Sequence, residues 1–154
     1  MRADLKTMLH QDGKLGSNQD SIDLAMLVID GSTLHYAGAN RPLIIIRNGE
    51  IKTVKPDNMP IGIYVKEKEH FRDNIIDLEP NDMLYTYSDG VTDQYGTDES
   101  GERKKFSTKR LKSTLQDLSR LPMQIQKEKM EAIIDGWRGD NEQIDDEILI
   151  GINI

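Results

Sequence analysis

The spacing of hydrophobic positions changes near Gly101, from short strand-like runs to a helical repeat. Beyond Gly101, apolar residues recur every three or four positions, which is typical of amphipathic helices. The β-branched run at residues 148–154 predicts a last strand that lies centrally in a sheet. The remaining patterns predict a short helix at residues 3–11, strands at 23–29, 34–37, 43–46, 51–54, 74–78 and 83–88, and two helices separated by Leu121 and Pro122.

Turn-forming dipeptides follow two of the predicted strands. Asp30-Gly31 and Asn48-Gly49 are typical of tight hairpin turns, so the strands around them are expected to form an antiparallel meander. No internal repeat or low-complexity linker divides the chain, and residues 1–154 are therefore expected to form a single domain. Strands that precede helices, with one strand returning at the end, predict an α+β fold with mainly antiparallel sheets.

Composition narrows the classes of protein that the chain can belong to. The chain has 154 residues, 36% of them hydrophobic, a net charge of −7 and no cysteine. The negative charge disfavours nucleic acid as a partner, and the absence of cysteine excludes disulfides and thiolate metal sites. No apolar run approaches the roughly 20 residues that span a bilayer, so no membrane contact is expected. The chain starts without the apolar stretch of a secretory signal, which favours a cytoplasmic location.

Two dipeptides that contain aspartate, Asp89-Gly90 and Asp145-Asp146, lie at the ends of predicted strands. Asp89 follows the strand at residues 83–88, and Asp145 and Asp146 precede the strand at residues 148–154. If these strands pair in antiparallel fashion, the end of one lies beside the start of the other, and the carboxylates share one edge of the sheet. Mg²⁺ and Mn²⁺ prefer such oxygen ligands. Carboxylates about 4 Å apart repel each other by about 4 kcal/mol at an effective dielectric of 20, so a cation would stabilise the pair.

The alternative interpretation of these dipeptides is purely structural. Asp89 and Gly90 are also compatible with a simple turn after a strand, and Asp145 and Asp146 with an ordinary loop. A calcium-binding or merely structural acidic domain is a further alternative, but the Asp-x-Asp-x-Asp-Gly pattern of an EF-hand is absent.

Several short motifs, in this order and spacing, resemble a known family. They are LHYAGANRPL at residues 34–43, NGE at 48–50, MPIG at 59–62, LEPNDML at 78–84, SDGVTD at 88–93 and DD at 145–146. Together they are similar to the later part of the phosphatase domain of sporulation stage II protein E-type proteins. That family belongs to the metal-dependent serine/threonine phosphatases, also called PPM or type 2C phosphatases.

The resemblance implies a fold and a chemistry. The fold would be an α-β-β-α sandwich, in which two antiparallel sheets pack face to face with helices outside. The complete domain would hold a binuclear Mn²⁺ or Mg²⁺ centre, where a metal-bound water attacks the phosphomonoester of a phosphoserine or phosphothreonine. No side chain would then act as the nucleophile.

The resemblance also assigns roles to particular residues. Asp89 and Asp145 would be metal ligands, and Gly90, Asp93 and Asp146 would lie in the outer shell that orients water and backbone. Arg41 is a candidate phosphate contact, since an arginine can clamp a phosphate through two hydrogen bonds; the alternative is that it is a surface or structural residue.

One departure from the family pattern changes the expected activity. In the family, an earlier strand carries an Asp followed by a Gly-His-Gly-like turn, and that Asp bridges both metals. No such segment is present in this sequence. We therefore expect an N-terminally truncated domain that binds metal weakly and turns over slowly or not at all. The alternative is a non-catalytic, phosphatase-like binding or regulatory module.

The family context implies partners as well. It suggests bacterial signalling, an N-terminal sensor domain in the parent protein, and a phosphoprotein substrate such as a small phosphoserine regulator. Uncovered sheet edges would also allow self-association.

Overall fold

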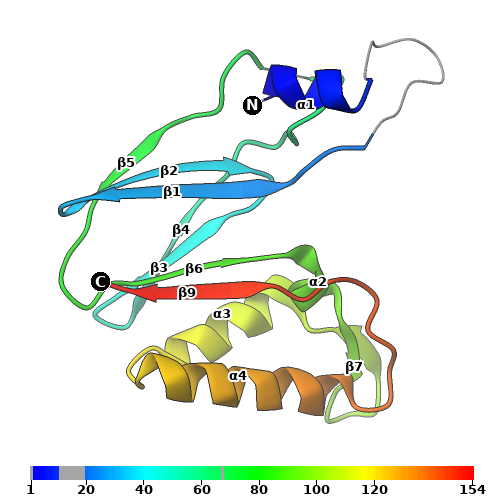
Figure 1. Ribbon diagram of the computed structural model, residues 1–154. Coiled ribbons are helices and arrows are strands. Elements are labelled where there is room, and N and C mark those ends of the chain that lie inside the picture. Colours follow the sequence, from blue (N-terminus) through cyan, green and yellow to red (C-terminus); the bar gives the residue numbers. More distant parts are fainter. Residues whose placement is uncertain (1, 11–19, 67) are drawn as a thin grey trace. The chain divides into compact units, whose positions relative to one another are not determined.

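The computed structural model of the protein describes residues 2–10, 20–66 and 68–154. Their contacts divide the chain into two compact units, which are described separately (Figure 1). The first unit comprises Met1–Leu43 and Val54–Leu78, and the second comprises Ile44–Thr53 and Glu79–Ile154. No helix among the described residues is long and apolar enough to cross a lipid bilayer.

The first unit contains a short helix and a three-stranded antiparallel sheet. The helix α1 spans Arg2–Met8, so it begins one residue before the range expected at residues 3–11 and ends earlier; Gln11 lies outside the described residues. The strands are β1 (Leu24–Asp30), β2 (Thr33–Ala39) and β5 (Asn74–Asp77), in the order β1-β2-β5. β1 and β2 pair along their whole length around the turn predicted at Gly31, which adopts a φ of 57°. These strands agree closely with the predicted ones.

The expected meander is wrong at the end of β2, where the chain leaves this sheet. Asn40 adopts a positive φ of 57°, and its side-chain amide donates a 2.9 Å hydrogen bond to Asp23. The Tyr36 hydroxyl donates to the carbonyl oxygen of Arg41 at 2.5 Å, while Pro42 has no N–H to offer a neighbouring strand. This corner directs the chain into a second sheet instead of a hairpin.

The second unit contains a four-stranded antiparallel sheet in the order β4-β3-β6-β9. Its strands are β3 (Leu43–Arg47), β4 (Glu50–Val54), β6 (Met83–Tyr87) and β9 (Leu149–Asn153). The strand β6 pairs with β9 in antiparallel register from Met83 opposite Asn153 to Tyr87 opposite Leu149. The pairing on which the acidic-edge prediction depended is therefore present.

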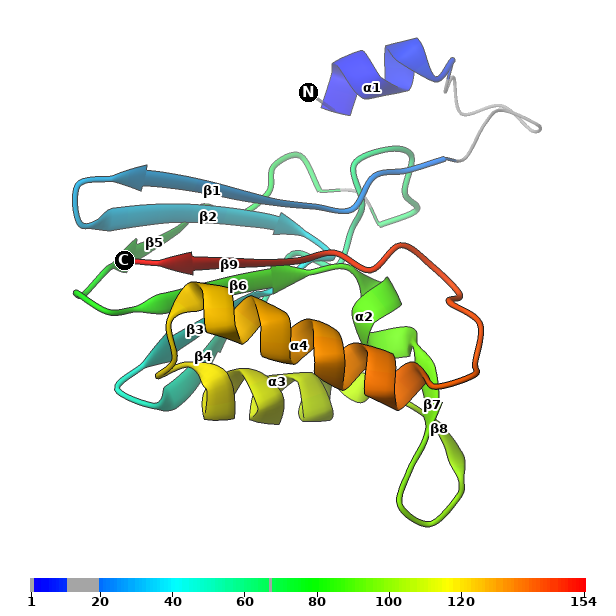
Figure 2. The same cartoon turned by 60° about the horizontal axis from the view of Figure 1, so that its bottom comes forward.

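Two helices cover one face of this sheet. In Figures 1 and 2, α3 (Ser107–Leu118) and α4 (Met123–Arg138) lie on the same side of β6 and β9. Pro122 lies immediately before α4, as expected for a residue that cannot continue a helix. The core between helices and sheet includes Ile44, Ile46, Met83, Tyr85, Tyr87, Leu111, Leu115, Leu118, Met130, Ile134 and Trp137. The predicted α+β class with antiparallel sheets and flanking helices is confirmed.

Two local expectations for this unit were wrong or incomplete. The last strand was expected in the middle of a sheet, but β9 lies at the edge of the described sheet, and Ile148 and Ile150 are about half exposed. Alternate residues of this apolar run face away from the helices, which sequence alone did not reveal. The short helix α2 (Asp89–Asp93) and the hairpin of β7 (Tyr95–Thr97) and β8 (Arg103–Lys105) were not predicted.

A buried ion pair joins β3 to the turn before β6. The Arg47 guanidinium donates to both carboxylate oxygens of Asp82, at 2.8 and 2.7 Å, and the N–H of Glu79 donates to the same carboxylate at 2.9 Å. Burial by itself would raise the pKa of Asp82, but these hydrogen bonds and the charge of Arg47 outweigh it and hold the pKa below its usual range. Asp82 is therefore ionised in the folded protein near neutral pH.

Candidate metal site

The first candidate ligand, Asp89, lies where β6 ends. Ser88 has an extended backbone, with φ −80° and ψ 160°, and Asp89 begins the short helix α2. The side chain of Asp89 is exposed, whereas Gly90 and Val91 behind it are buried. The strand fixes the backbone before Asp89, and α2 packs into the core after it. This arrangement places a carboxylate at the surface on a rigid support.

The second candidate ligand, Asp145, lies in the segment between α4 and β9. The backbone carbonyl of Asp145 accepts a 2.8 Å hydrogen bond from the Gln143 side chain. One oxygen of its carboxylate, Oδ1, accepts the N–H of Asp146 at 2.8 Å. Both aspartates are exposed. These local bonds orient the Asp145 carboxylate without burying it.

The two acidic segments are in direct contact through their backbones. A β-carbon built on Gly90 would overlap the carbonyl oxygen of Asp146 and lie 3.3 Å from the carbonyl carbon of Asp145. The Ser88 hydroxyl donates to the Asp146 carbonyl at 2.7 Å and accepts the N–H of Ile148 at 2.9 Å, while the Ser88 N–H donates to the Ile148 carbonyl at 2.9 Å. The structure therefore brings together the chain segments that carry Asp89, Asp145 and Asp146.

Asp93, a predicted outer-shell residue, forms an ion pair. It accepts a 2.8 Å hydrogen bond from the ammonium group of Lys105 in β8. This bond, with a smaller contribution from the negative charge of Asp89, raises the pKa of Lys105 above its ordinary value. The positive charge of Lys105 thus lies close to the acidic residues of α2.

Arg41, the candidate phosphate contact, lies in the first compact unit. Its guanidinium forms an ion pair with Asp23 at 3.0 Å, next to the corner that follows β2. This contact corresponds to the structural role that the sequence also allowed.

Mg²⁺ and Mn²⁺ prefer several oxygen ligands arranged around the ion. Within residues 2–10, 20–66 and 68–154, no group of three or more histidines, aspartates or glutamates is arranged to hold a metal. Asp89 and Asp145 provide two exposed carboxylates on adjoining segments. Mg²⁺ usually keeps several waters and takes one or two carboxylates, so these residues suit one such cation rather than a closed protein cage.

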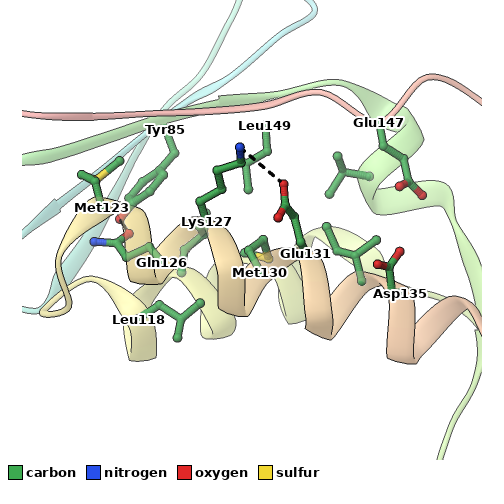
Figure 3. A pocket seen from close by; sticks show the side chains of 14 residues that line it. Tyr85, Leu118, Met123, Gln126, Lys127, Met130, Glu131, Asp135, Glu147 and Leu149 are labelled. Atoms are coloured by element: carbon green, nitrogen blue, oxygen red, sulfur yellow. Dashed lines mark hydrogen bonds and ion pairs between the residues drawn. The ribbon is translucent and has the colours of Figure 1, made fainter.

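Behind these segments, a recess of about 290 Å³ lies between α4, β6 and β9 (Figure 3). The Tyr85 hydroxyl donates a 2.6 Å hydrogen bond to Gln126 at one end of it, and Glu147 lies at the other end. Burial raises the pKa of Tyr85 to about 12, so this donor stays protonated at physiological pH. Val91 and Glu147 line the recess two residues after Asp89 and Asp145, respectively. Residues close to both candidate ligands therefore line the same recess.

Comparison with known families agrees with this architecture. The sequence profile of the family described as Stage II sporulation protein E (SpoIIE) matches residues 7–154. The chain belongs to the SpoIIE family. The resemblance seen in the motifs is thereby confirmed. A search of curated proteins found no sequence that matches this SpoIIE-family chain.

Solved structures share the fold of this SpoIIE-family chain. The SiaA-PP2C domain of Pseudomonas aeruginosa superposes with a TM-score of 0.83 and 24% identity, and the alignment covers 99% of this chain and 57% of that one. The manganese-presoaked phosphatase domain of SpoIIE from Bacillus subtilis gives a TM-score of 0.61 and 13% identity, covering 99% and 73%. A serine/threonine phosphatase from S. agalactiae gives 0.60 and 13%, covering 97% and 64%. The chain thus spans little more than half of the SiaA-PP2C domain.

The sequence of this SpoIIE-family chain did not predict two contacts near Asp89 and the Asp145–Asp146 segment. The bridging hydroxyl of Ser88 could have been anticipated, since Ser88 directly precedes Asp89 and faces the strand that follows Asp146. Lys105 could not, because it reaches Asp93 only through the unpredicted β7–β8 hairpin.

Proposed function

We propose that this chain is part of a metal-dependent protein serine/threonine phosphatase in which Asp89 and Asp145 ligate the same divalent cation. The observation that carries this proposal is the contact between the backbones of Gly90 and Asp145–Asp146, which brings two exposed carboxylates onto adjoining segments. Membership in the SpoIIE family supports it, as do structural relatives that are themselves named phosphatases. The proposed activity is that of the whole enzyme, and this chain supplies its SpoIIE-like part.

The proposed chemistry divides the work between the cation and the protein. When bound, Mn²⁺ or Mg²⁺ supplies Lewis acidity, which activates water and stabilises negative charge on phosphoryl oxygens. Asp89 and Asp145 provide anionic oxygens that hold the cation. Asp146 and Asp93 orient the surrounding backbone and water, and Lys105 offsets the charge of Asp93. A second cation would require ligands beyond these two carboxylates, so we expect slow turnover by this chain alone.

We further propose that the substrate is a phosphoprotein of a bacterial signalling pathway in the cytoplasm. A phosphoserine or phosphothreonine side chain presents a dianionic phosphoryl group, whose charge a divalent cation can balance. Arg41 stays a candidate phosphate contact, and its guanidinium forms an ion pair with Asp23. The name of the Bacillus subtilis relative, a cell fate determinant, is consistent with a regulatory role of this kind.

The direct test is Mn²⁺-dependent hydrolysis of para-nitrophenyl phosphate by this chain and by the Asp89→Asn variant. We expect about a tenfold loss of the metal-dependent rate in the variant, because asparagine keeps an oxygen donor but lacks the negative charge that attracts the cation. Asp117→Asn is the matched control, since Asp117 is an exposed aspartate in α3. Its rate should equal that of the wild type.

Either of two results would contradict the proposal. One is a wild-type rate that does not change when Mn²⁺ is removed by chelation. The other is an Asp89→Asn rate equal to that of Asp117→Asn.

A further inference from the structure

Ser88 joins the two acidic segments through its hydroxyl group. We infer that Ser88 is a positioning residue, which holds Asp89 against the Asp145 segment before a cation binds. This inference rests on the proposed function, because it concerns how the same cation site is built. Ser88 itself needs no contact with the cation or the substrate.

The hydrogen bonds of Ser88 take over where the strand pairing stops. The last ladder pair of β6 and β9 is Tyr87 opposite Leu149. One residue further, the Ser88 backbone N–H donates to the Ile148 carbonyl at 2.9 Å. The Ser88 hydroxyl then accepts the Ile148 N–H at 2.9 Å and donates to the Asp146 carbonyl at 2.7 Å. One side chain thus satisfies two backbone groups on either side of Glu147.

Asp89 lies between two points of attachment to the neighbouring segment. On one side, Ser88 is hydrogen bonded to Asp146 and Ile148. On the other side, Gly90 packs against the Asp146 backbone so closely that no β-carbon fits between them. A residue held on both sides has little freedom to move away from the segment that carries Asp145.

Electrostatics explains why such attachment matters. Two carboxylates on adjoining segments repel each other when both are charged. Without a cation, this repulsion drives the segments of Asp89 and Asp145 apart, and the Ser88 hydrogen bonds oppose it. A site that is held together before binding does not lose binding free energy to ordering. Supporting residues of this kind typically change metal affinity by about 10–100-fold when removed.

The test compares Ser88→Ala with Ser88→Thr, which retains the hydroxyl. Thr86→Val is the matched control, because it removes a hydroxyl from the same strand two residues earlier. Calorimetric titration with Mn²⁺ measures the Kd, and amide hydrogen exchange of metal-free protein reports on the Ile148 N–H. We expect about a tenfold higher Kd and faster Ile148 exchange in Ser88→Ala. Ser88→Thr and Thr86→Val should stay within about twofold of the wild type.

The outcomes separate this inference from the proposed function. If Ser88→Ala binds Mn²⁺ as the wild type does while Asp89→Asn binds it more weakly, the positioning role is refuted and the metal site stands. If Ser88→Thr fails to restore the affinity, or Thr86→Val loses as much as Ser88→Ala, the loss reflects general destabilisation and the inference is also refuted. A wild-type chain that binds no Mn²⁺ refutes the proposed function, and the positioning role with it.

Discussion

Replacing Arg47 by leucine lowers the free energy of unfolding by about 3 kcal/mol near pH 7. The substitution removes both guanidinium hydrogen bonds to Asp82. Of these three donors to the buried carboxylate, the Glu79 N–H then remains. Breaking a buried ion pair by removing one partner typically costs about 3–5 kcal/mol, and partial exposure of Arg47 favours the lower end of this range. Urea-induced unfolding followed by circular dichroism measures the effect.

The pH dependence of this effect distinguishes it from simple loss of packing. The pKa of Asp82 is lower in the folded protein than in the unfolded chain. The ion pair therefore stabilises the fold fully at pH values above the unfolded pKa of about 3.9. This stabilisation is lost as the pH falls through the folded pKa. The difference between wild type and Arg47→Leu should therefore shrink towards low pH. Arg120→Leu, at an exposed position after α3, should have little effect at any pH. A pH-independent difference for Arg47→Leu would show that the ion pair is not its cause.

Replacing Gly90 by alanine destabilises the protein by about 2 kcal/mol and weakens Mn²⁺ binding by up to about 100-fold. Alanine is the better helix former by about 1 kcal/mol, so a position in α2 that obeyed helix propensity alone would become more stable. Here the added β-carbon overlaps the Asp146 carbonyl oxygen, and that oxygen belongs to backbone held by Ser88. Overpacking of this kind typically costs about 1–3 kcal/mol and moves backbone. The segment that carries Asp145 would be displaced from Asp89.

Gly136 provides the matched control for this prediction. It lies in α4, and a β-carbon built on it meets no atom within 4 Å. Gly136→Ala should therefore raise the free energy of unfolding by about 0.5–1 kcal/mol and leave Mn²⁺ binding unchanged. Thermal unfolding and calorimetric titration of both variants provide the measurements. An increase in stability for Gly90→Ala would contradict the close approach of the two acidic segments.

The sequence predicted those features that depend on local pattern and pairing. The helical repeat of Leu111, Leu115 and Leu118 located α3, and Pro122 located the boundary before α4. The apolar runs located β6 and β9, and the antiparallel pairing that the acidic-edge prediction assumed is present. The family resemblance, carried by motifs such as SDGVTD at residues 88–93, is confirmed by the SpoIIE match.

Features that depend on the partner of each strand could not be predicted in the same way. Apolar runs show that a strand exists but not which sheet it joins, so the corner at Asn40 and the edge position of β9 were missed. Side-chain contacts between distant segments were equally hidden. The Asp93–Lys105 ion pair depends on a hairpin of short, polar strands that have no hydrophobic signal. The roles of Asp89 and Asp145 as metal ligands remain a prediction.

Paramagnetic broadening by Mn²⁺ tests most directly whether Asp89 and Asp145 hold the same cation. In amide NMR spectra of the isotope-labelled chain, small amounts of Mn²⁺ broaden signals from nuclei near the bound ion. We predict that signals of residues 88–93 and 144–148 broaden together at the same Mn²⁺ concentration, and that Asp89→Asn reduces the broadening in both segments. Broadening of one segment without the other, or broadening of both that Asp89→Asn leaves unchanged, would contradict a shared metal site.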